Sequence, residues 1–217
     1  MKLVFTVAVV PLAAVTLLAC LTLATRATAD DENGSLVFDS EEATPGIKPS
    51  FTFRYPSKMQ SQQVDEDILM QLFDESMGKG MSVQITVTRI DLGTEIVDMA
   101  EMRGYARFWN DLGTGMTPQG GTYDGEEEFQ LQGHKGADIY NTFTVDNDEG
   151  SSDNDEGSIT IFGATRAVFG KSGNLVHITC FSILPHDEVS VRSYTSRSNP
   201  IMTEYCRPVF DSLSISD

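Results

Sequence analysis

Basic residues, histidine and cysteine are all scarce in this chain of 217 residues, and each shortage argues against a class of function. Fifteen lysine and arginine side chains stand against 32 aspartate and glutamate side chains, which gives a net charge of −17. Phosphate backbones and anionic lipid head groups repel so acidic a chain. The composition therefore argues against nucleic-acid binding and favours a basic partner, if the partner is a protein.

The three histidines and three cysteines do not form a catalytic or metal-binding pattern. His134, His177 and His186 lack the HExxH spacing, and two cysteines beyond the N-terminal segment fall short of the four ligands of structural zinc. No GxSxG sequence is present for an esterase nucleophile. We therefore expect no catalytic residue, no metal site and no cofactor. His177 alternates with apolar neighbours in a strand pattern, so we place it on the surface of a sheet.

Three further patterns imitate functional motifs. Gly170-Lys171-Ser172 ends like a P-loop, but Thr165 stands where that loop requires glycine, so a hairpin turn is predicted. Residues 146–157 belong to a nearly identical tandem repeat of seven acidic and polar residues. Neither register of the repeat fits an EF-hand loop, and a solvated hairpin loop without a specific calcium site is predicted. The aromatic cluster around Trp109 has helical spacing, which indicates core packing rather than a ligand site.

Residues 1–29 have the pattern of a secretory signal peptide. Residues 3–24 are almost wholly apolar, and Ala27-Thr28-Ala29 offers the small-x-small sequence that signal peptidase accepts. We predict cleavage after Ala29. Two alternatives stay open: lipid modification at Cys20, or an uncleaved membrane anchor. All three place the folded domain outside the cytosol, in the periplasm or the extracellular space.

Only Cys180 and Cys206 remain beyond this segment. An even pair of cysteines in an exported chain is the setting in which disulfides form. We predict a Cys180–Cys206 bridge between a strand and the last helix, with two buried free thiols as the alternative.

Hydrophobic periodicity divides the remainder of the chain into a leader and one domain. Residues 30–50 are polar, contain Asn33 in a glycosylation sequon, and are expected to be loosely ordered. Residues 51–217 form the domain. Apolar alternation predicts strands at 51–55, 81–90, 126–131, 137–145, 159–169 and 175–184, and helical spacing predicts helices at 64–77, 94–112 and 201–213. The fold class is therefore α+β: an antiparallel sheet of five or six strands with two or three helices packed on it.

The order of these elements resembles that of a known family. Phe51-Thr52-Phe53-Arg54-Tyr55-Pro56 is similar to the opening strand of PsbP-like domains, the fold shared by the photosystem II extrinsic protein and a Ran-binding protein. Residues 132–137 are similar to the turn that follows the first long helix, residues 169–179 to a later hairpin, and residues 209–215 to the closing helix and strand. The acidic repeat and the predicted helix at 64–77 depart from the family pattern.

The resemblance implies a partner-binding domain that is often exported and has no catalytic residues to transfer. We therefore expect an exported, non-catalytic accessory domain that binds another protein. An extracytoplasmic carrier of small ligands is the main alternative, and a hydrolase is the third.

Overall fold

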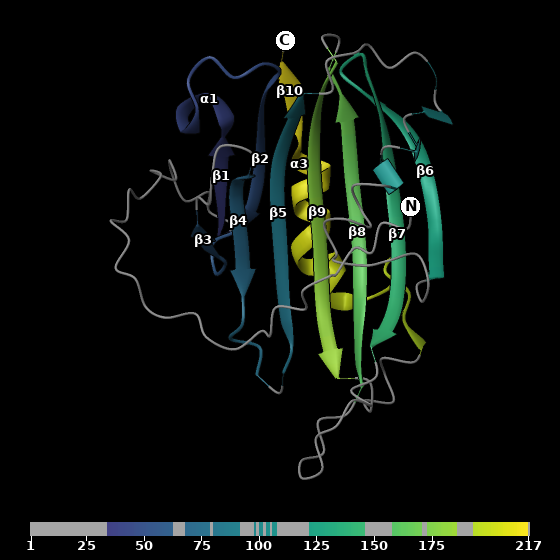
Figure 1. The fold of residues 1–217 in the computed structure, drawn as a ribbon. Helices are drawn as coiled ribbons and strands as arrows, with labels where there is room; N and C mark the ends of the chain where they lie inside the picture. The colour runs from purple at the N-terminus through teal and green to yellow at the C-terminus, as the bar shows by residue number, and fades with distance from the viewer. Residues whose placement is uncertain are drawn as a thin grey trace, which may run out of the picture.

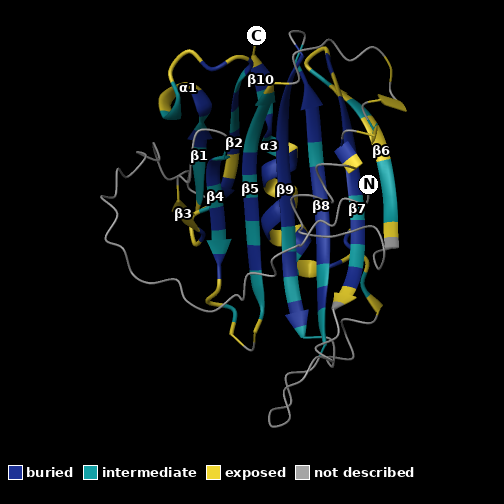
Figure 2. Ribbon diagram, in the orientation of Figure 1, coloured by how far each residue is buried: buried dark blue, intermediate teal, exposed yellow. Residues whose placement is uncertain are grey.

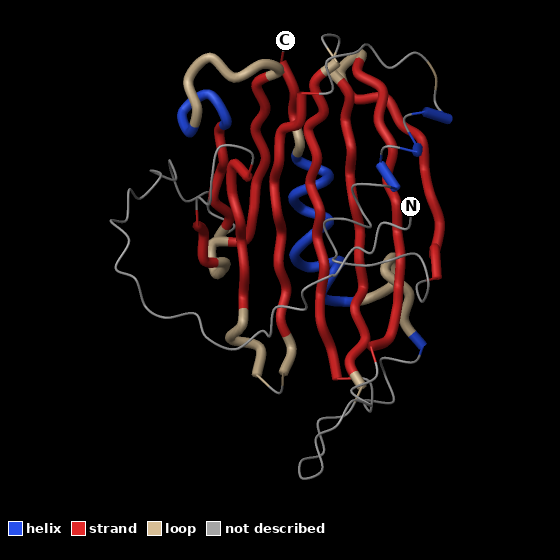
Figure 3. Tube along the Cα trace, viewed as in Figure 1, coloured by secondary structure: helices blue, strands red, loops and turns tan. Residues whose placement is uncertain are grey.

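The structure is a computed structural model, and it describes residues 34–62, 68–78, 80–91, 98, 100–101, 103–104, 106–107, 122–145, 158–170, 173–185 and 193–216. Most of these residues belong to strands, and the main helical segment lies near the C-terminus (Figure 3). No helix among the described residues is long and apolar enough to cross a membrane.

A seven-stranded antiparallel sheet forms the larger layer (Figure 1). Its strands, in spatial order, are β3 (Gln60–Gln62), β4 (Ile68–Asp74), β5 (Ser82–Asp91), β9 (Asn174–Pro185), β8 (Ile159–Phe169), β7 (His134–Val145) and β6 (Thr122–Leu131). Hairpins join β6 to β7 and β8 to β9; the β8–β9 register is continuous, and the β6–β7 register shifts between Tyr123 and Gly125. The hairpin turn predicted at Gly170 is confirmed, because the Gly170 amide donates to the carbonyl of Asn174 at 2.7 Å.

A three-stranded sheet and the C-terminal helix cover one face of the larger sheet (Figure 1). The small sheet has the order β1 (Ser35–Asp39), β2 (Ser50–Pro56) and β10 (Ser214–Ser216). One turn of helix, α1 (Ser40–Ala43), connects β1 to β2. The C-terminal segment consists of a π-helical turn, η2 (Met202–Cys206), that continues directly into α3 (Arg207–Ser212).

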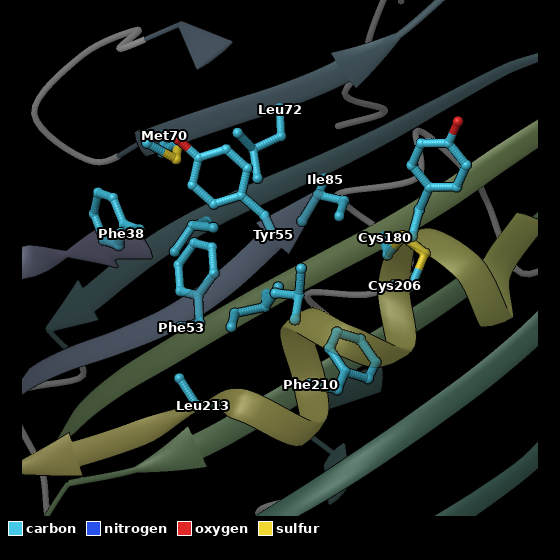
Figure 4. Close-up of a cluster of buried hydrophobic side chains, with 14 of the residues drawn as sticks. Phe38, Phe53, Tyr55, Met70, Leu72, Ile85, Cys180, Cys206, Phe210 and Leu213 are labelled. Atoms are coloured by element: carbon cyan, nitrogen blue, oxygen red, sulfur yellow. A yellow bond between two sulfur atoms is a disulfide. The ribbon is translucent and has the colours of Figure 1, made fainter. Parts of the chain in front are cut away.

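The main core fills the space between the two sheets. Phe53 and Tyr55 of β2 meet Leu72 of β4 and Ile85 of β5, and all four side chains are buried (Figure 4). Phe210 of α3 extends the same cluster toward β8. Complete burial of each large apolar side chain stabilises the fold by about 1.5–3 kcal/mol, so this layer is the main source of stability.

The opposite face of the large sheet is also apolar at one end. Ala137 and Ile139 of β7 and Ala167 and Phe169 of β8 cluster with Ala106, a helical residue outside the sheet. The inner strands are therefore buried on both faces, as the burial colouring of β8 and β9 shows (Figure 2). Strands buried on both faces have nearly continuous apolar sequence, as residues 159–169 and 175–184 do.

The architecture differs from the prediction in strand number and in one element type. The large sheet has seven strands rather than five or six, and a second sheet accompanies it. The predicted helix at 64–77 is wrong, because its described residues form β4. A bulge between Ile68 and Met70 buries Leu69 and Met70 in succession, which breaks the period of two and imitates helical spacing.

The two ends of the domain also differ from the prediction. Residues 35–43, which we expected to be loosely ordered, form β1 and α1, because β1 pairs with β2 and places Phe38 in the core. The predicted helix at 201–213 is present but shorter and begins with a π-helical turn, and Pro208 occupies the first turn of α3. Asn199 caps the segment, accepting from the amide of Ile201 at 2.8 Å.

Several predicted features lie outside the described residues. These are the signal segment with its alternatives at Cys20 and Ala29, the sequon at Asn33, the acidic repeat 146–157, Trp109 and its aromatic neighbours, and His186. Most of the predicted helix at 94–112 also lies outside them, although residues 100–101, 103–104 and 106–107 are helical.

Candidate functional site

A small hollow lies where the C-terminal helix crosses β6, β7 and β8. Its volume is about 150 Å³, and its walls include Glu127, Tyr140, Arg166, Arg197, Arg207 and Asp211. The first two side chains come from β6 and β7, Arg166 from β8, and the last two from α3. Three of the fifteen basic residues of this acidic chain thus gather at one place.

Arg166 is the centre of the inner wall. The β7–β8 register places Arg166 opposite Asp138 on the same face of the sheet. Its Nε and Nη2 donate to the two carboxylate oxygens of Asp138 at 2.8 and 2.6 Å, and Nη1 donates to the carbonyl of Phe210 at 2.5 Å. The guanidinium also lies 4.6 Å from the ring centre of Phe129 and 5.0 Å from that of Phe210. Arg166 therefore joins the sheet to α3 through both polar and aromatic contacts.

The ion pair keeps Arg166 charged inside this wall. Burial by itself lowers the pKa of the guanidinium, but hydrogen bonds to Asp138 and the charge of that carboxylate outweigh burial and raise the pKa above its ordinary value. Only 16% of the Arg166 side chain and 4% of the Asp138 side chain are exposed. The pair is a fixed part of the wall rather than a mobile surface contact.

Arg197 forms the outer wall and is held by the loop that precedes the C-terminal helix. Asp124 of β6 accepts from the amide of Ser196 at 2.9 Å, which fixes this loop against the sheet. The next residue, Arg197, pairs with Glu127 at 2.8 Å and lies 4.5 Å from the ring centre of Tyr140. Burial, followed by the charge of nearby carboxylates, raises the pKa of Tyr140 to about 12, so its hydroxyl stays protonated at neutral pH.

The predicted disulfide is present and supports the floor of the hollow. Cys180 of β9 is bonded to Cys206 of η2, with the two Cα atoms 5.9 Å apart (Figure 4). Cys206 lines the hollow, and both cysteines are buried. The bridge therefore holds η2 against the sheet beside the three arginines.

A second polar cluster surrounds Tyr205 of η2. Its hydroxyl donates to Oδ2 of the buried Asp74 at 2.8 Å, and the Ser76 hydroxyl donates to Oδ1 of the same carboxylate at 2.6 Å. Lys58 lies 4.1 Å from the centre of the Tyr205 ring and also pairs with Glu204. These contacts anchor η2 to β4 and satisfy the buried carboxylate of Asp74.

The histidines do not lie in the hollow. His134 is buried in β7, where its ring lies within 3.3 Å of the Phe169 carbonyl oxygen. The surface position predicted for His177 is wrong: the side chain is 3% exposed. It points to the face of β9 opposite the hollow, against the hydroxyls of Thr88 and Thr179. The alternation of His177 with apolar residues was interpreted as a strand with one face exposed to solvent. Both faces of β9 are covered by other parts of the protein.

No group of three or more His, Cys, Asp or Glu side chains among the described residues is arranged to hold a metal ion. The buried carboxylates Asp74 and Asp138 are instead bonded to tyrosine, serine and arginine side chains. The sequence analysis missed the arginine cluster. Its one visible signal is Arg166, a charged residue within the otherwise apolar run 159–169.

Comparison with known proteins finds likeness in structure but not in sequence. No protein-family model matches the chain, and no curated protein matches it. Among solved structures, cyanobacterial PsbP (CyanoP) from Synechocystis sp. is similar with a TM-score of 0.49 and 10% identity, over 92% of this chain and 98% of that one. The Ran-binding protein Mog1p from Saccharomyces cerevisiae is similar with a TM-score of 0.47 and 17% identity, over 77% of this chain and 90% of that one. These likenesses concern the fold alone.

Proposed function

We propose that this chain is an exported accessory domain that binds another protein at the hollow between β6–β8 and the C-terminal helix, and that it catalyses no reaction. The size and lining of the hollow carry the proposal. Pockets for drug-sized ligands occupy roughly 300–1,000 Å³ and are mainly apolar. A hollow of about 150 Å³ with arginine, tyrosine and carboxylate side chains on its walls suits one side chain of a protein partner.

The rigidity of the walls supports the same function. Arg166 is fixed by Asp138 and by the Phe210 carbonyl, and Arg197 is oriented by the Tyr140 ring. Side chains already held in place lose little conformational entropy when a partner binds. Such preorganisation favours an anchor pocket, into which one residue of the partner inserts.

The described polar groups favour binding over catalysis. A nucleophile needs a general base within hydrogen-bonding reach. Ser196, the serine that lines the hollow, donates its hydroxyl to the main-chain carbonyl of Asn141. A hydroxyl that donates to a carbonyl is not activated for attack, so we assign Ser196 a structural role.

Site-specific crosslinking tests the proposal. A photoreactive amino acid placed at Thr203, an exposed position on the rim of the hollow, is expected to trap one discrete protein from the extracytoplasmic fraction of the host. The matched control carries the same group at Ser216, an exposed hydroxyl residue at the end of β10 that does not line the hollow. Absence of a protein adduct at residue 203, or the same adduct at both positions, would contradict the proposal.

A further inference from the structure

The charged groups of the hollow are not equally engaged. The Arg166–Asp138 pair is buried and bidentate, so neither partner is free to receive a ligand. The Arg197–Glu127 pair is more open, with 39% and 57% of the two side chains exposed. Arg207 is exposed on α3, and within the described part of the chain no hydrogen bond or ion pair engages its guanidinium.

From this difference we infer that the hollow binds a carboxylate side chain of the partner, held by Arg207 and Arg197. The inference rests on the proposed function and names the chemical group that the hollow accepts. A guanidinium has five N–H donors arranged to bind carboxylates in bidentate fashion. Glu127 lies 2.8 Å from Nη1 of Arg197 in a pair that stays exposed to solvent, so an incoming carboxylate competes with Glu127 for this guanidinium.

The aromatic contact prepares Arg197 for this role. The Tyr140 ring lies against its guanidinium at 4.5 Å and limits the orientations that the side chain adopts. Tyr140 also keeps its proton at neutral pH, because its pKa is about 12. The Tyr140 side chain therefore adds no negative charge behind Arg197.

Two carboxylates near the rim oppose an incoming anion and define how it binds. Glu127 is already neutralised by Arg197, and an exposed pair of this kind is weak, so a ligand displaces it readily. Asp211 lies one helical turn after Arg207 on α3 and also lines the hollow. Its charge directs the carboxylate toward the Arg207 and Arg197 side of the hollow and disfavours a ligand with several negative charges.

The net charge of −17 acts on a partner before it contacts the hollow. Physiological salt screens exposed charges beyond about 8 Å, so the overall charge governs the approach of a partner while the hollow selects the group that inserts. A partner that is basic overall and presents one acidic side chain satisfies both requirements.

Arginine side-chain NMR tests the inference directly. The probe is glutamate with both backbone ends blocked, added to the ¹⁵N-labelled protein, and the matched probe is blocked glutamine, which has the same shape without the charge. We expect saturable shifts of the Nε–Hε signals of Arg197 and Arg207 with the glutamate probe and none with the glutamine probe. Arg207→Gln is expected to weaken binding about tenfold or more, the usual range for a hydrogen bond to a charged group.

The control variant is Arg107→Gln. Arg107 is another exposed arginine paired with a glutamate of β6, but it pairs with Glu126, on the opposite face of the sheet from Glu127. Binding is expected to be unchanged in this variant. Equal binding of the two probes, or full binding by Arg207→Gln, would overturn the inference. Stronger shifts with N-acetylalanine would overturn the side-chain assignment in favour of a terminal carboxylate.

The crosslinking experiment separates the two proposals. If the adduct at residue 203 persists in Arg207→Gln while the glutamate probe does not bind, the binding function stands and the carboxylate inference fails. If the probe binds but no adduct forms, the carboxylate site stands and the protein-binding function fails.

Discussion

His177 provides a quantitative test of how the large sheet is covered. Its imidazole is buried in β9, with Nδ1 3.1 Å from the Thr88 hydroxyl and Nε2 3.2 Å from the Thr179 hydroxyl. Burial lowers its pKa from 6.5 to about 4, because the protonated ring loses its hydration there. Acidification from neutral pH to about pH 4 is the perturbation.

Whether acid raises or lowers the free energy of unfolding depends on which state, folded or unfolded, binds the proton at the higher pH. In the unfolded chain His177 takes up a proton near pH 6.5, whereas in the folded protein it does so only near pH 4. Below pH 6.5 protonation therefore stabilises the unfolded state, and the free energy of unfolding falls until about pH 4, where the loss levels off. Each pKa unit corresponds to about 1.36 kcal/mol, so the full loss is about 3 kcal/mol.

Urea unfolding at a series of pH values measures this loss. The many carboxylates of the chain also titrate as the pH falls, so the relevant quantity is the difference between the wild type and His177→Gln, which has no titrating ring. That difference is expected to shift by about 3 kcal/mol against the wild type between neutral pH and pH 4. A difference that does not change with pH would refute the reasoning. If the variant does not fold, an NMR titration of the His177 ring gives the pKa directly, and a pKa near 6.5 refutes it equally.

Three further substitutions test the remaining parts of the structure by urea unfolding. Replacing Cys180 and Cys206 together by alanine is expected to lower the free energy of unfolding by about 3–4 kcal/mol, because the unfolded chain is no longer closed into a loop of this length. An unchanged free energy of unfolding would contradict the bridge. Gly136→Ala is expected to cost about 1–3 kcal/mol, because its Cβ would lie 2.9 Å from a main-chain carbonyl oxygen of β8; a neutral result would show that the strands adjust. Arg166→Met is expected to cost about 3–5 kcal/mol because it leaves Asp138 buried and unpaired, and a double variant that also replaces Asp138 by leucine should recover part of that loss.

The sequence predicted the long strands well and the short or interrupted elements poorly. Residues 159–169 form β8 as expected, because an uninterrupted apolar run between turn residues fits a strand buried on both faces. β4 was mistaken for a helix because one bulge is enough to change the apparent period. β1 was missed because its short apolar run, Leu36-Val37-Phe38, stands within a polar leader, and its stability comes from pairing with β2, a tertiary contact.

The candidate site was largely beyond prediction. The disulfide was predictable, because export and an even cysteine count suffice to suggest it. The arginine cluster was not, because Arg166, Arg197 and Arg207 are well separated in sequence and meet only through the β7–β8 register and the position of η2 and α3. The burial of His177 was missed for a similar reason, since its cover comes from elsewhere in the chain.

The pairing of β10 with β2 has a consequence for the order in which the chain acquires its structure. Ser50 and Ser216 lie opposite each other in the small sheet although 166 residues separate them. Contacts between residues so far apart in sequence slow folding, because the entropy of closing the loop is lost before the contact is gained. Until η2, α3 and β10 arrive, β8 and β9 lack the cover of η2, and Cys180 of β9 lacks its disulfide partner. A chain that has emerged only as far as β9 therefore exposes the part of the apolar face that η2 and α3 cover, and completion of the C-terminal segment is the step that excludes water from it.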